Sequence, residues 1–459
     1  MQRFDAIIVG AGQAGPPLAG RLTQAGKSVC LVERKYFGGT CVNTGCMPTK
    51  TLVASAYAAH LARRAADFGV RAGDIAIDMK MVAARAHKVT LDARTNNERW
   101  LEGMDRLTFI RGHARFVGPD SLSVNGETLT APHIFLNVGC RATVPDMPGI
   151  KDVPYLDNTD VVGLDTLPEH LVIIGGSYIG LEFAQMYRRF GAAVTVIERD
   201  ERLIAREDPD VTSAVRKILE DEGITVRTGV NCVGFARHER GVSVSVDCRE
   251  GDPAVIGSHV LLAVGRRPNT DDLGLNEAGI KTNARGYIEV DDVLQTNVPG
   301  IWALGDCNGR GAFTHTAYND FEIVAANLLD GEARKLSERI LGYALYIDPP
   351  LGRVGMTETQ AAAAGRPILV STRPMTRVGR AVEKGETKGF MKIVADAQTH
   401  RILGAAILGT GGDEAIHGIL DMMNADQPTS RLRWAVPIHP TVSELIPTLL
   451  GGLAPPREA

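Results

Sequence analysis

Two cysteines that lie close together, Cys41 and Cys46, are the residues best suited to redox chemistry. Four residues separate them within a Gly-rich stretch, residues 38–50 (GGTCVNTGCMPTK). We expect a turn around the pair and a helix opened by Pro48, which continues through residues 51–64. A helix N-terminus near Cys46 would lower its thiol pKa from about 8.5 toward roughly 3.5–7.5. The pair is therefore predicted to be a working dithiol that can form a disulfide.

The alternatives for this pair are two unrelated cysteines in a turn, or half of a zinc site. A zinc site needs a second pair of Cys or His ligands at short spacing, and none follows in the sequence. We therefore expect no metal ligands. The other cysteines are predicted to be small buried hydrophobic residues, namely Cys30, Cys140, Cys232, Cys248 and Cys307.

A dinucleotide-binding motif comes just before the cysteine pair. An apolar strand expected over residues 5–9 leads into G-x-G-x-x-G, and a second strand over residues 28–32 ends at Glu33. The glycines of the motif are Gly10, Gly12 and Gly15. Glycines permit a tight turn and close approach of a pyrophosphate, the following helix N-terminus attracts its charge, and the acid binds a ribose hydroxyl. This unit is predicted to bind a dinucleotide.

The same unit occurs a second time. Residues 171–180 (LVIIGGSYIG) run from an apolar strand into a turn that contains Gly175 and Gly180, and a strand over 194–197 ends at Glu198. The last glycine and the acid are 18 positions apart in both units, 15 to 33 and 180 to 198. This equal spacing indicates an internal duplication.

Two departures bear on the ligand of the second unit. Ser177 replaces a glycine, which leaves slightly less room for a pyrophosphate. Glu198 favours NADH because a carboxylate binds the 2′-hydroxyl, whereas Arg199 and Arg202 could neutralise the 2′-phosphate of NADPH. We expect NADH or NADPH as electron donor, with NADH favoured.

Two dinucleotide sites in one chain, one for a fixed cofactor and one for a diffusing nicotinamide, are typical of a flavoprotein. Residues 296–306 add a predicted strand that ends in Gly-Asp. There Asp306 could reach a hydroxyl or pyrophosphate of a flavin. FAD is therefore the expected fixed cofactor.

Together these motifs resemble the class I pyridine nucleotide–disulfide oxidoreductases, which include glutathione reductase, dihydrolipoamide dehydrogenase and mercuric reductase. The resemblance spans nearly the whole chain and includes residues 264–269 (VGRRPN) and 439–444 (HPTVSE). It implies an α/β fold with two Rossmann-like dinucleotide-binding domains and a C-terminal α+β dimerisation domain. The implied domains are an FAD domain (1–149), an NAD(P)H domain (150–268), a central segment that completes the FAD domain (269–337) and a dimer-interface domain (338–459).

The resemblance also assigns roles. Cys46 would contact the flavin and Cys41 would attack the substrate. Lys50 would lie near flavin N5, held by Glu182, and Tyr178 would cover the flavin until nicotinamide arrives. The other cofactor-site residues that it implies are Glu33, Gly39, Thr40, Gly139, Gly265, Arg266 and Asp306.

His439 is the expected acid–base residue. Glu444 lies five positions later and can hold one ring nitrogen, so that the other exchanges a proton. In the family this histidine reaches the dithiol of the partner subunit. The resemblance therefore implies a homodimer with shared active sites and an inactive monomer.

The electron acceptor stays open between three interpretations. A small disulfide is favoured. Residues 353–358 (RVGMTE), together with Met47 and Thr49, look closest to a metal-reductase-like branch, so copper(II) or mercury(II) is the alternative. Mercuric reductases usually end in a vicinal Cys pair and often begin with a metal-binding domain, and the absence of both here argues against efficient mercury handling. A redox-sensing or complex-associated flavoprotein is the third interpretation.

The amino-acid composition and net charge limit the classes of partner that we expect. Hydrophobic residues make up 44% and charged residues 23% of the chain, as in globular proteins, and the net charge of −4 gives no reason to expect nucleic acid or an anionic membrane. No leader and no run of about 18 apolar residues is present, so we expect a cytoplasmic enzyme.

Overall fold

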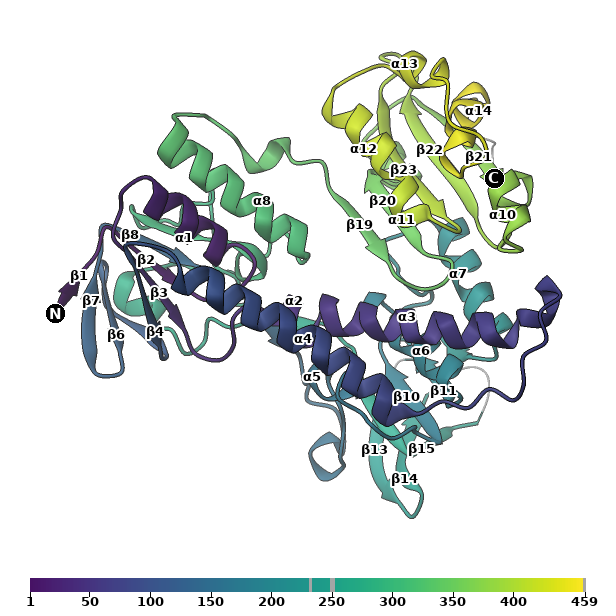
Figure 1. Cartoon of the computed structure of the whole chain (residues 1–459), viewed down its shortest axis with the longest axis horizontal. Coiled ribbons are helices and arrows are strands. Elements are labelled where there is room, and N and C mark those ends of the chain that lie inside the picture. The colour runs from purple at the N-terminus through teal and green to yellow at the C-terminus, as the bar shows by residue number, and fades with distance from the viewer. Residues whose placement is uncertain (231–232, 248–251, 457–459) are drawn as a thin grey trace.

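Each predicted dinucleotide-binding unit forms a parallel β-sheet (Figure 1). The structure, a computed structural model, describes residues 1–230, 233–247 and 252–456. The first sheet has the strand order β18-β8-β2-β3-β4. Its elements are β2 (Ala6–Val9), α1 (Gly15–Gln24), β3 (Val29–Glu33), β4 (Leu107–Arg111), β8 (His133–Leu136) and β18 (Ile301–Ala303). Strands β2 and β3, joined by α1, are the two strands that the sequence predicts around the first glycine motif.

The second sheet repeats this arrangement, with the parallel order β12-β11-β10-β16. Its elements are β10 (His170–Ile174), α6 (Tyr178–Phe190), β11 (Ala193–Ile197), α7 (Pro209–Asp221), β12 (Thr225–Arg227) and β16 (His259–Leu262). Strands β10 and β16 are almost wholly buried. Burial on both faces explains why such strands are continuous apolar runs in the sequence.

The last quarter of the chain forms an antiparallel sheet of order β19-β20-β23-β22-β21. Its strands are β19 (Gly342–Leu345), β20 (Leu351–Gly355), β21 (Ile368–Pro374), β22 (Phe390–Asp396) and β23 (Ile402–Leu408). Its helices include α9 (Glu358–Ala363), α10 (Gly379–Glu383), α11 (Gly412–Ala415), α12 (His417–Asn424), α13 (Thr429–Arg433) and α14 (Ile446–Gly451). Two parallel α/β units and this α+β part confirm the predicted fold class.

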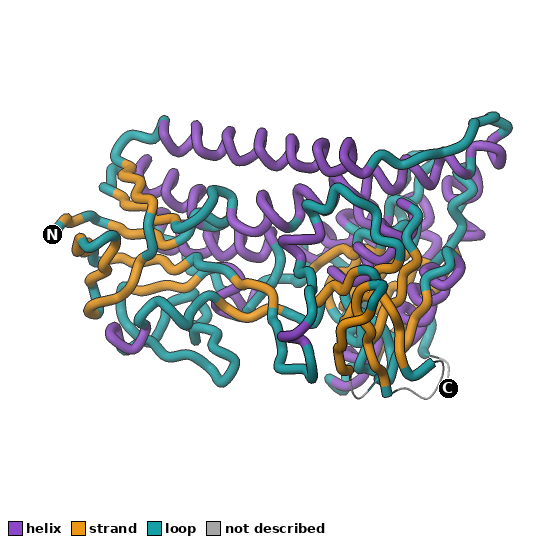
Figure 2. The backbone as a smooth tube through the Cα atoms, turned by 90° about the horizontal axis from the view of Figure 1, so that it is seen from below, coloured by secondary structure: helices purple, strands orange, loops and turns teal. Residues whose placement is uncertain are grey.

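The three parts meet around the long helix α3 (Cys46–Arg63), and a second long helix, α4 (Met79–Glu102), lies beside it (Figure 1). Helix α3 packs against α4 and against α6 of the second unit. Figure 2 shows helices gathered along one side of the molecule, with the strands beneath them. In the described part of the chain, no helix has the length and apolar character that crossing a membrane requires.

The structure also contains further strands and the helices α5 and α8. They are β1 (Gln2–Arg3), β5 (Ala114–Gly118), β6 (Ser121–Val124), β7 (Glu127–Thr130), β9 (Cys140–Ala142), α5 (Asn158–Val161), β13 (Val233–His238), β14 (Gly241–Val246), β15 (Ala254–Gly257), β17 (Arg266–Pro268) and α8 (Thr314–Ala325). The strand predicted over 296–306 is wrong in length. Only residues 301–303 pair as a strand, because Pro299 and Gly300 form a turn before them and a 3-10 helix (Gly305–Asn308) begins shortly after them.

Candidate functional site

Cys41 and Cys46 lie at the junction of two helices. Cys41 is inside α2 (Gly39–Thr44), and Cys46 is the first residue of α3. The sequence predicts a turn at Cys41 and a helix from Pro48, and both points are wrong. A proline in the first helical turn loses no hydrogen bond, so α3 can begin two residues before it. The earlier start places Cys46 itself at the helix N-terminus.

The thiols of Cys41 and Cys46 differ in pKa. Both cysteines are free thiols, and a hydrogen bond from Cys41 is the main cause that lowers the pKa of Cys46 to about 6. The Thr314 hydroxyl, 3.2 Å from Cys46 Sγ, and the charge of Lys50 lower that pKa further. The same thiol–thiol bond, together with burial, raises the pKa of Cys41. At neutral pH the proton therefore stays on Cys41 and the negative charge on Cys46.

Lys50 lies one helical turn beyond Cys46 and is held from two other parts of the chain. Its Nζ is 2.6 Å from Glu182 Oε2 on α6. Glu182 is buried, and its other oxygen accepts a hydrogen bond of 3.0 Å from the backbone N–H of Tyr346. The Tyr346 ring lies 4.5 Å from the same Nζ. Tyr346 was not predicted, and its partners are far away in the sequence.

Both glycine turns leave no room for side chains. A Cβ on Gly10 would lie 2.3 Å from the carbonyl oxygen of Asn137, and one on Gly175 would lie 2.4 Å from that of Ala263. A Cβ on Gly15 would lie 2.3 Å from the carbonyl of Gly10, and one on Gly180 would lie 2.1 Å from that of Gly175. The turns are thus equivalent, as expected of a duplicated unit. Gly12 and Ser177 occupy the remaining motif position.

The acidic residues that end β3 and β11 also match. Glu33 accepts hydrogen bonds from the backbone N–H groups of Ala11, at 2.8 Å, and Lys35, at 2.7 Å. Glu198 accepts the corresponding bonds from Gly176, at 2.5 Å, and Asp200, at 2.9 Å. Each carboxylate is therefore fixed beside its own glycine turn, where an acid that binds a ribose is expected.

Arg266 contacts two predicted cofactor-site residues, Thr40 and Asp306, and the backbone of Cys140 beside the first unit. Its guanidinium donates to Thr40 Oγ1 at 3.3 Å and to the carbonyl of Cys140 at 2.6 Å, and it lies 3.5 Å from Asp306. Burial raises the pKa of Asp306. Arg266 Nε is buried with no hydrogen-bond partner among the described residues.

Three further glycines border the same region. Gly39 has a φ of +58° and would collide, as alanine, with Gly12. Gly139 and Gly265 have φ values of +65° and +115°, and a Cβ there would meet nothing within 4 Å. A closed glycine turn, an unpaired buried Arg266 Nε and open space at these glycines fit a dinucleotide such as FAD.

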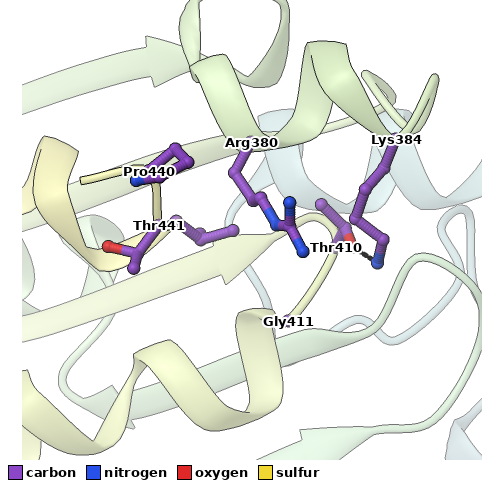
Figure 3. A pocket seen from close by; sticks show the side chains of 7 residues that line it. Arg380, Lys384, Thr410, Gly411, Pro440 and Thr441 are labelled. Carbon is purple, nitrogen blue, oxygen red and sulfur yellow. Dashed lines mark hydrogen bonds between the residues drawn. The ribbon is translucent and has the colours of Figure 1, made fainter. Parts of the chain in front are cut away.

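His439 and Glu444 form a separate pair. His439 Nδ1 lies 2.8 Å from Glu444 Oε2, and the two side chains are 79% and 13% exposed. A pocket of about 350 Å³ adjoins them and is lined by Arg380, Lys384, Thr410, Gly411, Pro440, Thr441 and Val442 (Figure 3). The structure thus brings Cys41, Cys46, Lys50 and Glu182 together but leaves His439 facing outward.

Three of the other cysteines confirm their prediction. Cys30, Cys140 and Cys307 are buried, and burial raises the pKa of each thiol. Cys232 and Cys248 lie outside the described residues.

Comparison with known proteins gives consistent matches. The family model described as pyridine nucleotide-disulphide oxidoreductase matches residues 4–320, and the model of its dimerisation domain matches 342–450. The chain is 37% identical to the probable pyridine nucleotide-disulfide oxidoreductase RclA of Escherichia coli K12, over 97% of this chain and 98% of that protein. It is 36% identical to a mercuric reductase of Streptomyces lividans, over 90% of this chain and 88% of that protein. The solved Cu(II) complex of the HOCl-induced flavoprotein disulfide reductase RclA superimposes with a TM-score of 0.88 at 36% identity, covering 97% of this chain and 99% of that one.

Proposed function

Since this chain belongs to the pyridine nucleotide-disulphide oxidoreductases, a family of enzymes that use FAD and NAD(P)H, we propose that it passes electrons from NADH through Cys41 and Cys46 to a small disulfide. The observation that carries the proposal is the position of the two cysteines around the start of α3, where Cys46 lies 3.2 Å from the Thr314 hydroxyl and Lys50, one turn later, is held by Glu182. The matched dimerisation domain supports a homodimer. The described cysteines are free thiols, as expected in a reducing compartment, so we retain the cytoplasm in the proposal.

Cys41, Cys46 and His439 would act in separate steps of disulfide reduction. When bound, FAD supplies the two-electron chemistry that links the nicotinamide to the dithiol. Cys41 gives its proton to His439 of a second copy, and its thiolate attacks one sulfur of the substrate disulfide. The leaving thiolate takes that proton from His439. Cys46 then attacks the Cys41 sulfur, which closes the protein disulfide and releases the second substrate thiolate.

The glycine turns and the acids beside them would hold the two dinucleotides. For the nicotinamide donor, Glu198 supports NADH, because its carboxylate lies where a 2′-phosphate would be repelled. Arg199 is 81% exposed and lies 3.6 Å from Asp200, so an acid already neutralises part of its charge. Lys50 and Tyr178 complete the proposed flavin side of the site.

The deciding experiment is anaerobic oxidation of NADH and NADPH by the purified flavoprotein. The acceptors are oxidised glutathione, lipoamide, a quinone, copper(II) and mercury(II). We expect turnover with a disulfide, lost in Cys41→Ser and in His439→Ala while FAD stays bound. Disulfide turnover that survives both substitutions would contradict the proposal.

A copper(II) reductase is the second candidate, favoured by the solved Cu(II) complex of a relative at 36% identity. Thiolates such as Cys46 are soft ligands that suit copper(I), the product of this reduction. This function predicts NADH consumption that depends on the metal and on both cysteines but tolerates loss of His439. If no metal accelerates NADH oxidation, this candidate is removed.

A further inference from the structure

Tyr178 separates the second glycine turn from the dithiol. It is the first residue of α6, one helical turn before Glu182, which holds Lys50. Its ring meets that of Phe313 edge-on, with 6.1 Å between centroids. Phe313 directly precedes Thr314, the hydrogen-bond partner of Cys46. Under the proposed function, a nicotinamide bound by the second unit would therefore approach the dithiol past the Tyr178 ring.

The ring of Tyr343, in β19, packs against the Tyr178 ring. The Tyr178 and Tyr343 rings are edge-on, with centroids 5.3 Å apart and an interplanar angle of 81°. Tyr343 also stacks on Phe313, at 5.5 Å and 12°. Edge-on contacts between aromatic rings are favourable, so Tyr343 stabilises the observed position of Tyr178.

A hydrogen bond made by the Tyr343 hydroxyl fixes the position of the Tyr343 ring. Tyr343 donates a short hydrogen bond to Glu207, which is 3% exposed and lies between β11 and α7. The other oxygen of Glu207 accepts bonds of 3.0 and 2.5 Å from Nε and Nη2 of Arg353. Arg353 is the cross-strand neighbour of Tyr343 in the β19–β20 pair. One buried carboxylate of the second unit is thus held by two facing residues of the antiparallel sheet.

The Tyr178 hydroxyl has no such anchor. It is buried and lacks a hydrogen-bond partner within the described residues. A buried hydroxyl without a well-formed hydrogen bond disfavours the closed position. The ring packs against Tyr343, Phe313 and the Arg206 guanidinium, which lies 5.3 Å from its centroid. Burial raises the pKa of Tyr178 and the Tyr343 hydroxyl lowers it, so Tyr343 acts on this ring through its hydroxyl as well as through its ring.

We propose that Tyr343 is a positioning residue for Tyr178: its ring, fixed through Glu207 and Arg353, holds Tyr178 closed and limits access of the nicotinamide. The identity of this ligand rests on the proposed function. When the open ring must form before binding, the apparent Kd is the intrinsic Kd divided by the open fraction. A substitution that weakens the packing of Tyr343 on Tyr178 should therefore raise the open fraction and lower the apparent Kd for the nicotinamide.

The test compares Tyr343→Leu, which removes the ring, with Tyr343→Phe, which keeps the ring and removes the hydroxyl that contacts Glu207 and Tyr178. Tyr57→Phe is the matched control, because the Tyr57 hydroxyl also donates to a carboxylate, that of Glu386 at 2.7 Å. Calorimetry on the holoenzyme gives the Kd for NAD⁺. Fluorine NMR of protein labelled with fluorotyrosine gives the environment of Tyr178, whose signal is assigned with Tyr178→Phe.

We expect the Kd for NAD⁺ to fall about two- to tenfold in Tyr343→Leu and by less in Tyr343→Phe, with a displaced Tyr178 signal in both. Tyr57→Phe should match the wild type. An unchanged or raised Kd in both Tyr343 variants would overturn the proposal. If Tyr343→Leu fails to fold, the Kd of Tyr343→Phe for NAD⁺ tests the proposal alone. If the wild type binds no NAD⁺, the proposed function fails, and an unmoved Tyr178 signal would then overturn the role of Tyr343 separately.

Discussion

The Lys50 ammonium lies 2.6 Å from a Glu182 carboxylate oxygen, and this contact joins the helix of the dithiol to the helix of the second glycine turn. The second Glu182 oxygen accepts the Tyr346 N–H from the antiparallel-sheet part. Because the Lys50 charge is one of the causes that lower the Cys46 pKa, all three parts of the chain contribute to ionisation of one thiol.

Removing the Lys50 charge should raise the Cys46 pKa above about 6, because the thiolate loses a nearby cation. In Lys50→Met, labelling of Cys46 by iodoacetamide at pH 7 should be slower and should reach its half-maximal rate at higher pH. Peptide mass spectrometry measures the rate at this cysteine. Lys88→Met is the control, since Lys88 is exposed and paired with Asp92. An unchanged pH profile in Lys50→Met would contradict the role of this charge.

The thiol of Cys41 should have a larger effect than Lys50, because its hydrogen bond is the main cause of the low Cys46 pKa. In Cys41→Ala the thiolate loses a donor, so the Cys46 pKa rises toward its ordinary value. In Cys41→Ser a hydroxyl still donates, and the rise should be smaller. The same labelling experiment ranks the two variants, and equal profiles would argue against the thiol–thiol bond.

His439→Ala should lower kcat with a disulfide by a factor of about 100 to 10,000, as expected for loss of an acid–base group. His417→Ala, an exposed histidine of the same part of the chain, should leave kcat unchanged. Glu444→Gln should have a smaller effect, because the ring keeps a hydrogen-bond partner.

Shared active sites predict complementation. When inactive Cys41→Ser and His439→Ala subunits exchange, half of the dimers are mixed and each has one intact site, so about a quarter of wild-type activity should return. Subunit exchange is followed by mass spectrometry. Mixed dimers that stay inactive would show that His439 does not act across the interface.

Glu198→Ser should shift the cofactor preference toward NADPH by about tenfold or more in kcat/KM, since the carboxylate that repels a 2′-phosphate is gone. Steady-state kinetics with both nucleotides measures this ratio. Glu201→Ser removes an equal charge from an exposed neighbour and should leave the ratio near that of the wild type. A similar shift in both variants would indicate a general charge effect.

The Asp208 carboxylate should contribute folding stability that is lost at low pH. Burial opposes its ionisation, but the N–H and hydroxyl of Thr359, the Lys392 ammonium and the N–H of Glu358 hold its pKa at about 2, below the ordinary 3.8. A lowered folded-state pKa stabilises the protein above about pH 4, and this stability is lost as the pH falls toward 2. Asp208→Asn should therefore lower Tm at pH 7 and flatten the decline of Tm from pH 4 to 3. The control is Asp105→Asn, at an exposed position.

Local patterns in the sequence predicted the elements that local rules control. The apolar runs before Gly10 and Gly175 became β2 and β10, and the glycines adopted the same closed turn twice, because a Cβ has no room there. The start of α3 was misplaced, since a proline is tolerated at any position of the first helical turn and so does not mark the first residue.

The residues that the sequence did not reveal act over long separations. Tyr343 meets Glu207 across 136 positions, and Tyr346 meets Glu182 across 164. No periodicity or short motif links such positions, because their contact depends on how the antiparallel sheet docks against the second unit.

The sequence by itself determined two dinucleotide units, a dithiol at a helix N-terminus and the spacing that lets Glu444 hold His439, since each depends on neighbours within a few turns or one strand–turn–helix unit. Tertiary structure alone decided which cysteine keeps the proton, what holds Lys50 and what encloses Tyr178. The physical reason is that pKa values and ring positions depend on burial and on charges brought together by packing, which are properties of the assembled domains.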